Sequence, residues 1–222
     1  MQNLPVHITI DSALYTKDPN SSKLGQNIVS HSIDMIDELG FEAFTFKKLG
    51  TRIGSNESSI YRYFESKHVL LVYLISWYWS WVEYTMVFST SNIASPVERL
   101  EKCIYILTRK IDKDNDFSYI NEINLGNIII SESSKAYHTK AVDKENKLGY
   151  FKTYKRVVQR VSDIVLEINP TYDFPHMLIS TVIEGAHQQR YFSEHLPSLT
   201  DVKKGKDTVV NFYTHLVFRA IT

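Results

Sequence analysis

The chain has 222 residues, of which 43% are hydrophobic and 23% charged, as in an ordinary soluble protein able to bury a sizeable core. Lys and Arg together number 25, as do Asp and Glu, so the formal net charge is zero. This balance does not indicate a nucleic-acid partner, and any basic surface must be local. The single cysteine, Cys103, excludes an intramolecular disulfide framework and fits a cytoplasmic location.

Two segments bear on targeting and membrane insertion. Residues 1–20 lack a basic start followed by an apolar run, so we expect no signal peptide. They are interpreted as a loose N-terminal leader, with a short strand at 7–10 as the alternative. Residues 69–88 are mostly apolar and long enough to cross a bilayer. Glu83 lies inside them and no second such segment follows, so a buried helix and no membrane association are predicted.

The pattern of apolar residues after position 22 is helical almost throughout, which predicts an all-α protein. The first helix is expected over about 23–39, with Leu24, Ile28, Ile33 and Ile36 on its buried side and Gly40 after its end. Thr45 is a natural N-cap for a second helix. Gly54 allows a tight turn, and a short third helix follows through Tyr63.

A long fourth helix is expected from Ser66 into the mid-80s, followed by a polar linker over 89–96. Val97, Leu100, Ile104, Leu107 and Ile111 then predict an amphipathic helix, and 112–116 a solvated turn. Later helices are predicted over these ranges: about 117–131, a long amphipathic helix ending at 169–170, about 174–194 and about 204–220.

Residues 40–67 combine two short helices joined by a tight turn, the arrangement of a helix-turn-helix that reads a DNA major groove. Across 45–67 there are five basic residues against two acidic ones, an excess of three, which vanishes over the wider range 21–67. The basic surface is therefore narrow, and DNA affinity should depend on a few phosphate contacts.

Over about residues 24–77 the chain resembles the TetR family of bacterial transcription regulators. The resemblance rests on the spacing of Gly40-Phe41, Thr45, Gly54, Tyr61, Phe64 and Ser66-Lys67. It implies a three-helix head, followed by a larger helical body that binds a ligand and dimerises. The expected divisions are a leader at 1–20, a DNA-binding domain at 21–67, and a ligand-binding and dimerisation domain at 68–222. Two positions depart from the family: Gly50 replaces the usual alanine and Ser55 a small aliphatic residue, which suggests a looser head.

The candidate DNA contacts follow from helix geometry and, for Lys67, from the family's phosphate-binding lysine. Thr45 and the adjacent amides would hold a phosphate at a helix N-terminus, and the third helix would offer small polar side chains to base edges. The candidates are Thr45, Lys47, Lys48, Asn56, Glu57, Ser58, Ser59, Tyr61, Arg62, Tyr63 and Lys67. Alternatively Tyr61 or Tyr63 packs internally, Arg62 is a solvated charge, and Glu57 is a surface residue.

An aromatic segment at 77–88 carries the second candidate site. The resemblance implies that this helix borders a ligand cavity, and aromatic walls would suit a small apolar or aromatic effector. Plain core packing is the alternative for each aromatic residue. The candidate lining residues, with their polar neighbours, are Trp77, Trp81, Tyr84, Phe88, Asn121, Asn124, His138 and His187.

The last two predicted helices carry broad apolar faces that would pair with a second copy of the chain. The candidate interface residues are Met177, Val182, Gly185, Ala186, Val209, Phe212, Tyr213, Leu216 and Val217. Such a two-fold dimer would read a palindromic operator. The alternative is a monomer that buries these faces internally.

Enzyme chemistry has little support. Glu184 and His187 form one E-x-x-H pair, whereas a di-iron site needs two such pairs and further carboxylates. No catalytic residues, metal ligands or cofactor are predicted. The sequence therefore predicts a homodimeric regulator that binds double-stranded operator DNA and is released from it by a small effector. The alternative is a helical ligand-binding or protein-interaction protein whose head does not bind DNA.

Overall fold

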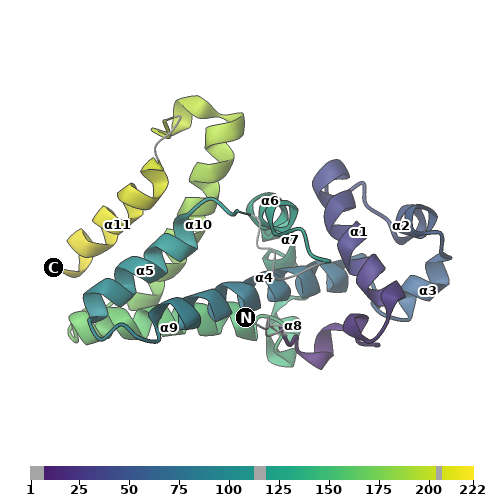
Figure 1. The fold of residues 1–222 in the computed structure, drawn as a ribbon, viewed down its shortest axis with the longest axis horizontal. Helices are drawn as coiled ribbons and strands as arrows, with labels where there is room; N and C mark the ends of the chain where they lie inside the picture. The colour runs from purple at the N-terminus through teal and green to yellow at the C-terminus, as the bar shows by residue number, and fades with distance from the viewer. Residues whose placement is uncertain (1–7, 113–118, 204–206) are drawn as a thin grey trace, which may run out of the picture. The chain divides into compact units, whose positions relative to one another are not determined.

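A computed structural model of the chain describes residues 8–112, 119–203 and 207–222. These residues form helices joined by loops, with no β-strand among the described elements, as the all-α prediction requires (Figure 1). They divide into two compact units. Unit 1 comprises Met1–Ser80 and Ile111–Lys152, and unit 2 comprises Trp81–Lys110 and Thr153–Thr222. Unit 1 therefore contains the whole predicted DNA-binding domain.

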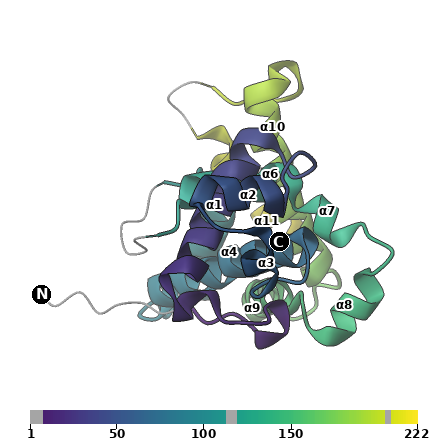
Figure 2. The same ribbon diagram turned by 90° about the vertical axis from the view of Figure 1, so that its right-hand side faces the viewer.

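Helix α1 of unit 1 spans Lys23–Leu39, as predicted. Ser22 caps its N-terminus by accepting a hydrogen bond from the Gly25 amide, and Gly40 ends it with a φ of 76°. Its buried side packs beside α6 (Glu122–Glu132) and against α2 (Phe46–Ile53), as Figures 1 and 2 show. The remaining helices of this unit are α3 (Glu57–Tyr61), the first part of α4 (Lys67–Thr90), α7 (Ser134–Tyr137) and α8 (Val142–Leu148).

Residues 8–22, here called the N-terminal segment, are packed against the rest of unit 1, so the expectation of a loose leader over 1–20 is wrong from residue 8 on, and residues 1–7 lie outside the described residues. They contain two 3-10 turns, η1 (Ser12–Leu14) and η2 (Pro19–Ser21), and Leu14 is 1% exposed. The Thr16 amide donates to the Tyr63 carbonyl at 2.8 Å. Burial of Leu14 and pairing of backbone groups together hold the segment against the start of α4 and the residues before it.

Helix α4 is apolar on nearly every side, and its residues from Val69 to Trp79 are all buried. No helix among the described residues is long and apolar enough to cross a membrane. Within unit 2, the acidic residue of this segment, Glu83, is paired with Arg156 at 2.6 Å and Arg160 at 3.2 Å. Burial opposes ionisation of Glu83, but the two arginines outweigh it and lower its pKa.

The middle of the chain differs most from the predicted elements. Helix α6 begins at Glu122 rather than near 117, and Asn121 caps it by accepting a hydrogen bond from the Asn124 amide. Residues 117–118, and 113–116 of the predicted turn, lie outside the described residues. The polar stretch after α6 contains α7 and α8, which were not predicted because both are short and carry few apolar residues.

Unit 2 contains the end of α4, then α5 (Pro96–Thr108), α9 (Lys152–Ile168), α10 (Pro175–His195), η3 (Pro197–Leu199) and α11 (Thr208–Ile221). Helices α10 and α11 pack on α5 and on each other (Figure 1). Two of the five residues expected on the apolar face of α5 do not belong to its buried face. Val97 is exposed on the first turn, and Ile111 lies beyond the end of the helix. The predicted linker at 89–96 is shorter, since α4 continues to Thr90.

Candidate nucleic-acid interface

The helix-turn-helix begins with α2, which is positioned by its cap and by a close turn. The Thr45 hydroxyl accepts a hydrogen bond from the Lys48 amide at 3.2 Å. The helix ends at Gly54, whose φ of 65° lies in the left-handed region. A Cβ on Gly50 would lie 2.7 Å from the Ser55 carbonyl oxygen. Glycine at position 50 therefore permits a tighter turn, and the expectation that it loosens the head is not supported by its surroundings.

Helix α3 is organised by Asn56, the N-cap residue. Its Oδ1 accepts hydrogen bonds from the Ser59 amide at 2.8 Å, the Ser58 hydroxyl at 2.8 Å and the Ser59 hydroxyl at 2.6 Å. Three of the predicted base-reading residues are thus bonded to one another. Glu57 lies in the first turn, where the partial positive charge of the helix N-terminus favours a carboxylate. The polar cluster is exposed, so its hydroxyl groups remain at the surface of α3.

The two predicted tyrosines have different environments. Tyr61 is 50% exposed, and its ring packs edge-on against Phe46 with centroids 5.0 Å apart. Tyr63 is 3% exposed, and its hydroxyl forms a 2.7 Å hydrogen bond with Ser22. Lys17 of the N-terminal segment lies over the Tyr63 ring at 5.0 Å. Tyr63 therefore packs internally, as the alternative interpretation has it, whereas half of Tyr61 stays exposed at the surface.

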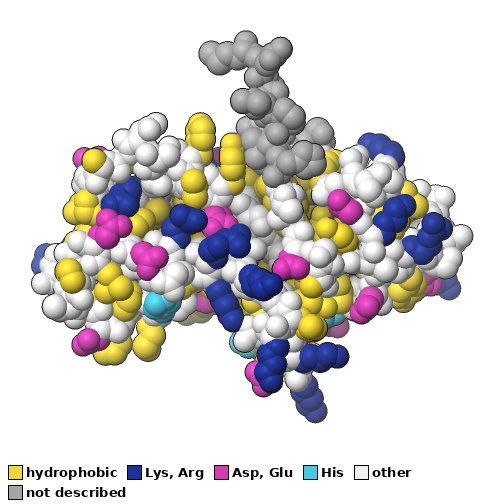
Figure 3. Space-filling model, turned by 90° about the horizontal axis from the view of Figure 1, so that it is seen from below, with side chains coloured by type: hydrophobic (Ala, Val, Ile, Leu, Met, Phe, Trp, Pro, Cys, Tyr) yellow, Lys and Arg dark blue, Asp and Glu magenta, His cyan; other side chains and the backbone are white. Residues whose placement is uncertain are grey.

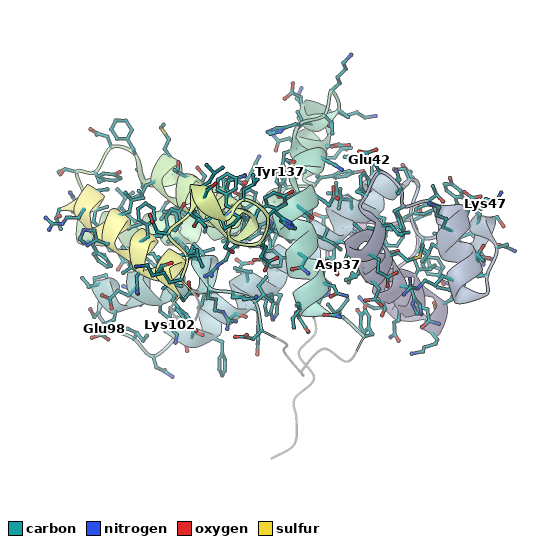
Figure 4. All side chains as sticks on the ribbon, turned by 90° about the horizontal axis from the view of Figure 1, so that it is seen from above. Asp37, Glu42, Lys47, Glu98, Lys102 and Tyr137 are labelled. Atoms are coloured by element: carbon teal, nitrogen blue, oxygen red, sulfur yellow. The ribbon has the colours of Figure 1, made fainter. Side chains whose placement is uncertain are left out.

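The basic residues also divide by environment. Lys47 is exposed and lies on the side of α2 away from α1 (Figure 4), and Arg62 is exposed after α3. Lys48 donates to the Ala43 carbonyl at 2.7 Å. Arg52 forms a bidentate ion pair with Glu38 at 2.6 and 2.9 Å, so its charge is largely balanced.

Lys67 lies at the start of α4 with its ammonium group turned onto the loop between α1 and α2. It donates to the carbonyls of Phe41 at 2.9 Å, Glu42 at 3.2 Å and Phe44 at 3.3 Å. On the face drawn in Figure 3, Lys and Arg side chains lie in several small groups with Asp and Glu among them, and they do not form one continuous basic field. The candidate interface is therefore reduced to a small set of exposed or half-buried residues: Thr45, Lys47, Ser58, Ser59, Tyr61 and Arg62.

The predicted effector-pocket residues fall in both units. In unit 1, Trp77 is buried, Asn124 donates to Asp34 at 3.0 Å, and Asn121 and His138 are exposed. In unit 2, Trp81 and His187 are buried, whereas Tyr84 and Phe88 are exposed and stacked with centroids 6.2 Å apart. A small recess in unit 1 contains none of these residues. It is lined by Ala13, Tyr15, Thr16, Glu65, Val69 and Tyr150.

The predicted dimer residues separate into two sets. Val182, Ala186, Val209, Tyr213 and Val217 are each at most 5% exposed within one copy of the chain. Gly185 serves the same internal packing, because a Cβ there would lie 2.3 Å from the Tyr213 hydroxyl. Met177, Phe212 and Leu216 are exposed, at 68%, 57% and 37%. Only this second set can contribute apolar area to an interface without repacking the unit.

Sequence reasoning missed the residues that position the head from a distance. Glu132 lies on α6, yet its Oε1 accepts a hydrogen bond from the Phe41 amide at 3.1 Å across 91 positions of sequence. Ser22 and Lys17 contact Tyr63 from the N-terminal segment. No local pattern marks such contacts, since a glutamate on an amphipathic helix ordinarily faces solvent.

The described residues form an all-helical protein with an N-terminal helix-turn-helix. Residues 28–74 match the family described as bacterial regulatory proteins, tetR family, so the chain carries a TetR-family N-terminal domain. No curated protein matches the chain in sequence.

Three solved structures share the fold over most of their length. The TetR family transcriptional regulator PfmR from Thermus thermophilus is 16% identical, with a TM-score of 0.57 over 86% of this chain and 97% of PfmR. AibR, solved with isovaleryl coenzyme A and operator DNA, is 14% identical, with a TM-score of 0.56 over 87% and 98%. The superantigen PfiT is 15% identical, with a TM-score of 0.59 over 91% and 97%. At these identities the likeness establishes the fold alone.

Proposed function

We propose that the protein is a sequence-specific regulator that binds double-stranded operator DNA through α2, the turn and α3. The exposed side chains of Lys47 in α2 and of Tyr61 and Arg62 at the end of α3, together with the capped N-termini of both helices, support this proposal. Thr45 and the first amides of α2 are placed to bind a phosphate. Ser58, Ser59 and Tyr61 are then the residues nearest to base edges and thymine methyl groups.

The proposed assembly is a homodimer on a palindromic operator, with a small effector that releases it. A two-fold dimer presents two copies of α3, whose spacing has to fit successive major grooves. AibR was solved with both an acyl coenzyme A and operator DNA, and by analogy an apolar or aromatic effector is proposed for the helical body here. The effector would favour a spacing of the two heads that no longer fits the operator, so the protein would act as a repressor.

Selection of bound sequences from a random duplex library tests this function. The wild type is expected to enrich a palindromic motif, and Tyr61→Ala and Arg62→Ala are expected to lose it. Lys102→Ala, which removes an exposed lysine of α5 in unit 2, is the matched control and should enrich the same motif (Figure 4). If the folded wild type enriches nothing at low salt, the DNA-binding proposal is wrong, and the alternative of a ligand-binding or protein-interaction protein takes its place.

A further inference from the structure

The loop between α1 and α2, residues 40–45, is held by charged side chains from three different helices. Its carbonyl groups at Phe41, Glu42 and Phe44 accept hydrogen bonds from Lys67 of α4, and the carbonyl of Ala43 accepts one from Lys48 of α2. Its amide at Phe41 donates to Glu132 of α6. The loop leads directly to Thr45, the cap of α2, so whatever moves the loop moves the N-terminus of that helix.

Lys67 has no donor left for DNA in this arrangement. An ammonium group carries three N–H donors, and three carbonyl oxygens lie within hydrogen-bond distance of its Nζ. The same nitrogen lies 4.6 Å from the centroid of the Phe41 ring. A phosphate contact would require Lys67 to leave these carbonyls, which would then lose their partners.

Glu132 holds the loop from the opposite side through a charged group that is itself fixed. Its side chain is 10% exposed, and Lys135 pairs with its Oε2 at 2.7 Å. The carboxylate raises the pKa of Lys135, so this lysine stays charged. A carboxylate that accepts a backbone N–H in a buried site makes a stronger hydrogen bond than a neutral acceptor does.

Helix α6 is attached to the head at a second place. Asn124, at the start of α6, donates to Asp34 of α1 at 3.0 Å, and the two helices pack along each other. Between these contacts, Gly126 leaves room for Ile111, whose Cδ1 would lie 2.3 Å from a Cβ at that position. Helix α6 therefore contacts α1 through Asn124 and the loop through Glu132.

We propose that Glu132 and Lys67 are positioning residues for DNA binding: together they set the position of residues 40–45 and hence of the phosphate-binding end of α2. This inference rests on the proposed function. Lys67 acts here on the protein backbone, and DNA is bound by the exposed residues of α2 and α3.

The first test compares Glu132→Ala with Glu132→Gln and with Glu145→Ala. Glu145 is the matched control, because its side chain is 11% exposed, it is paired with His68 at 2.8 Å, and it lies on α8 of the same unit. Fluorescence anisotropy with the selected duplex is measured at a temperature where circular dichroism shows every variant folded. Amide hydrogen exchange of residues 41–48 is measured without DNA.

Glu132→Ala is expected to weaken DNA binding about tenfold or more, since a hydrogen bond to a charged group is lost beside the interface. Its amides at 41–48 should exchange faster. Glu132→Gln keeps an oxygen acceptor for the Phe41 amide and should stay within about threefold of the wild type, as should Glu145→Ala. If Glu132→Ala binds like Glu145→Ala and its loop exchanges as in the wild type, the inference is overturned while the proposed function stands.

The second test asks whether Lys67 and Glu132 act on the same loop. The double variant Lys67→Met/Glu132→Ala should have nearly the same DNA affinity as whichever single variant binds DNA more weakly, because either change alone releases the loop. Lys47→Met is the comparison: when it is combined with Glu132→Ala, the fold losses of DNA affinity caused by the two changes should multiply. If the losses of Lys67→Met and Glu132→Ala multiply in full, Lys67 contacts DNA independently and the inference is wrong. A wild type that binds no duplex contradicts the proposed function, and the exchange measurement then still reports on the loop.

Discussion

Gly50 shows how one residue without a side chain sets the geometry of the helix-turn-helix. Alanine at a helix interior is ordinarily favoured over glycine by about 1 kcal/mol. Here the Ser55 amide donates to the Gly50 carbonyl at 2.9 Å, and an added Cβ would lie 2.7 Å from the Ser55 carbonyl oxygen. That oxygen is a backbone atom and cannot rotate away. The contact therefore outweighs helix propensity at this position.

Gly50→Ala is accordingly expected to lower the free energy of unfolding by about 1 kcal/mol or more, because the turn has to shift. Urea unfolding of the full chain measures it. Thr51→Ala is the control, since Thr51 is the exposed neighbour on the same helix and its replacement should change stability by less than about 0.5 kcal/mol. A Gly50→Ala variant that is more stable than the wild type would contradict the packing argument.

The buried His187 of unit 2 should make the free energy of unfolding depend on pH. Burial lowers its pKa to about 4, below the ordinary value of 6.5. Between these values the unfolded chain binds a proton that the folded chain does not, so stability falls as the pH falls. From pH 7 to pH 5 the expected loss from this group is about 2 kcal/mol.

Urea unfolding of the wild type and His187→Gln at pH 7 and pH 5 measures this loss. The variant should lose about 2 kcal/mol less than the wild type between the two pH values. His138→Gln, which removes an exposed histidine, should keep the full dependence. Identical pH dependence in the wild type and His187→Gln would show that folding does not lower the pKa of His187.

The N-terminal segment is packed into unit 1, although its polar composition suggests a loose leader. It is mostly polar, yet Ile8, Ile10 and Leu14 are buried, and the Gly25 position of α1 lets Pro19 pass within 2.3 Å of where a Cβ would be. Tyr119 also donates to Asn20 of this segment. These contacts make the segment part of unit 1 rather than a leader attached to it.

Leu14→Ala should therefore destabilise the protein by about 2–5 kcal/mol, the usual cost of truncating a buried leucine. It should also speed proteolytic cleavage within residues 8–22, because the segment opens more often. Thr9→Ala, at an exposed position of the same segment, is the control and should be neutral. Unchanged unfolding of Leu14→Ala would restore the interpretation as a loose leader.

Elements with local signals were predictable and those without were not. Helices α1 and α2 have caps at Ser22 and Thr45 and regular apolar spacing, so the sequence predicts their bounds. Helices α7 and α8 lack such spacing and are stabilised by tertiary packing. At the candidate site, exposure of Lys47 and Tyr61 follows from helical periodicity. The burial of Tyr63 and the engagement of Lys67 depend on partners 41 and 23 to 26 residues away, which no local pattern encodes.

The exposed apolar side chains of α10 and α11 bear on the expected assembly of two copies of the chain. Met177, Phe212 and Leu216 carry no catalytic chemistry, and large apolar side chains at a surface indicate an interface when they gather on neighbouring helices. A two-fold dimer through α10 and α11 would cover them, and it would hold two heads for the two halves of a palindrome.

Phe212→Glu combined with Leu216→Glu is expected to convert the proposed dimer to monomers in analytical ultracentrifugation, because burying unpaired charges at an interface costs several kcal/mol. Binding to the palindromic duplex should fall with it, since each monomer then contributes only one half-site. Leu199→Glu is the matched control: Leu199 is 57% exposed, as Phe212 is, but it lies in η3 rather than on α10 or α11. A double variant that stays dimeric places the interface elsewhere, whereas a wild type that is monomeric at every concentration contradicts the dimer itself.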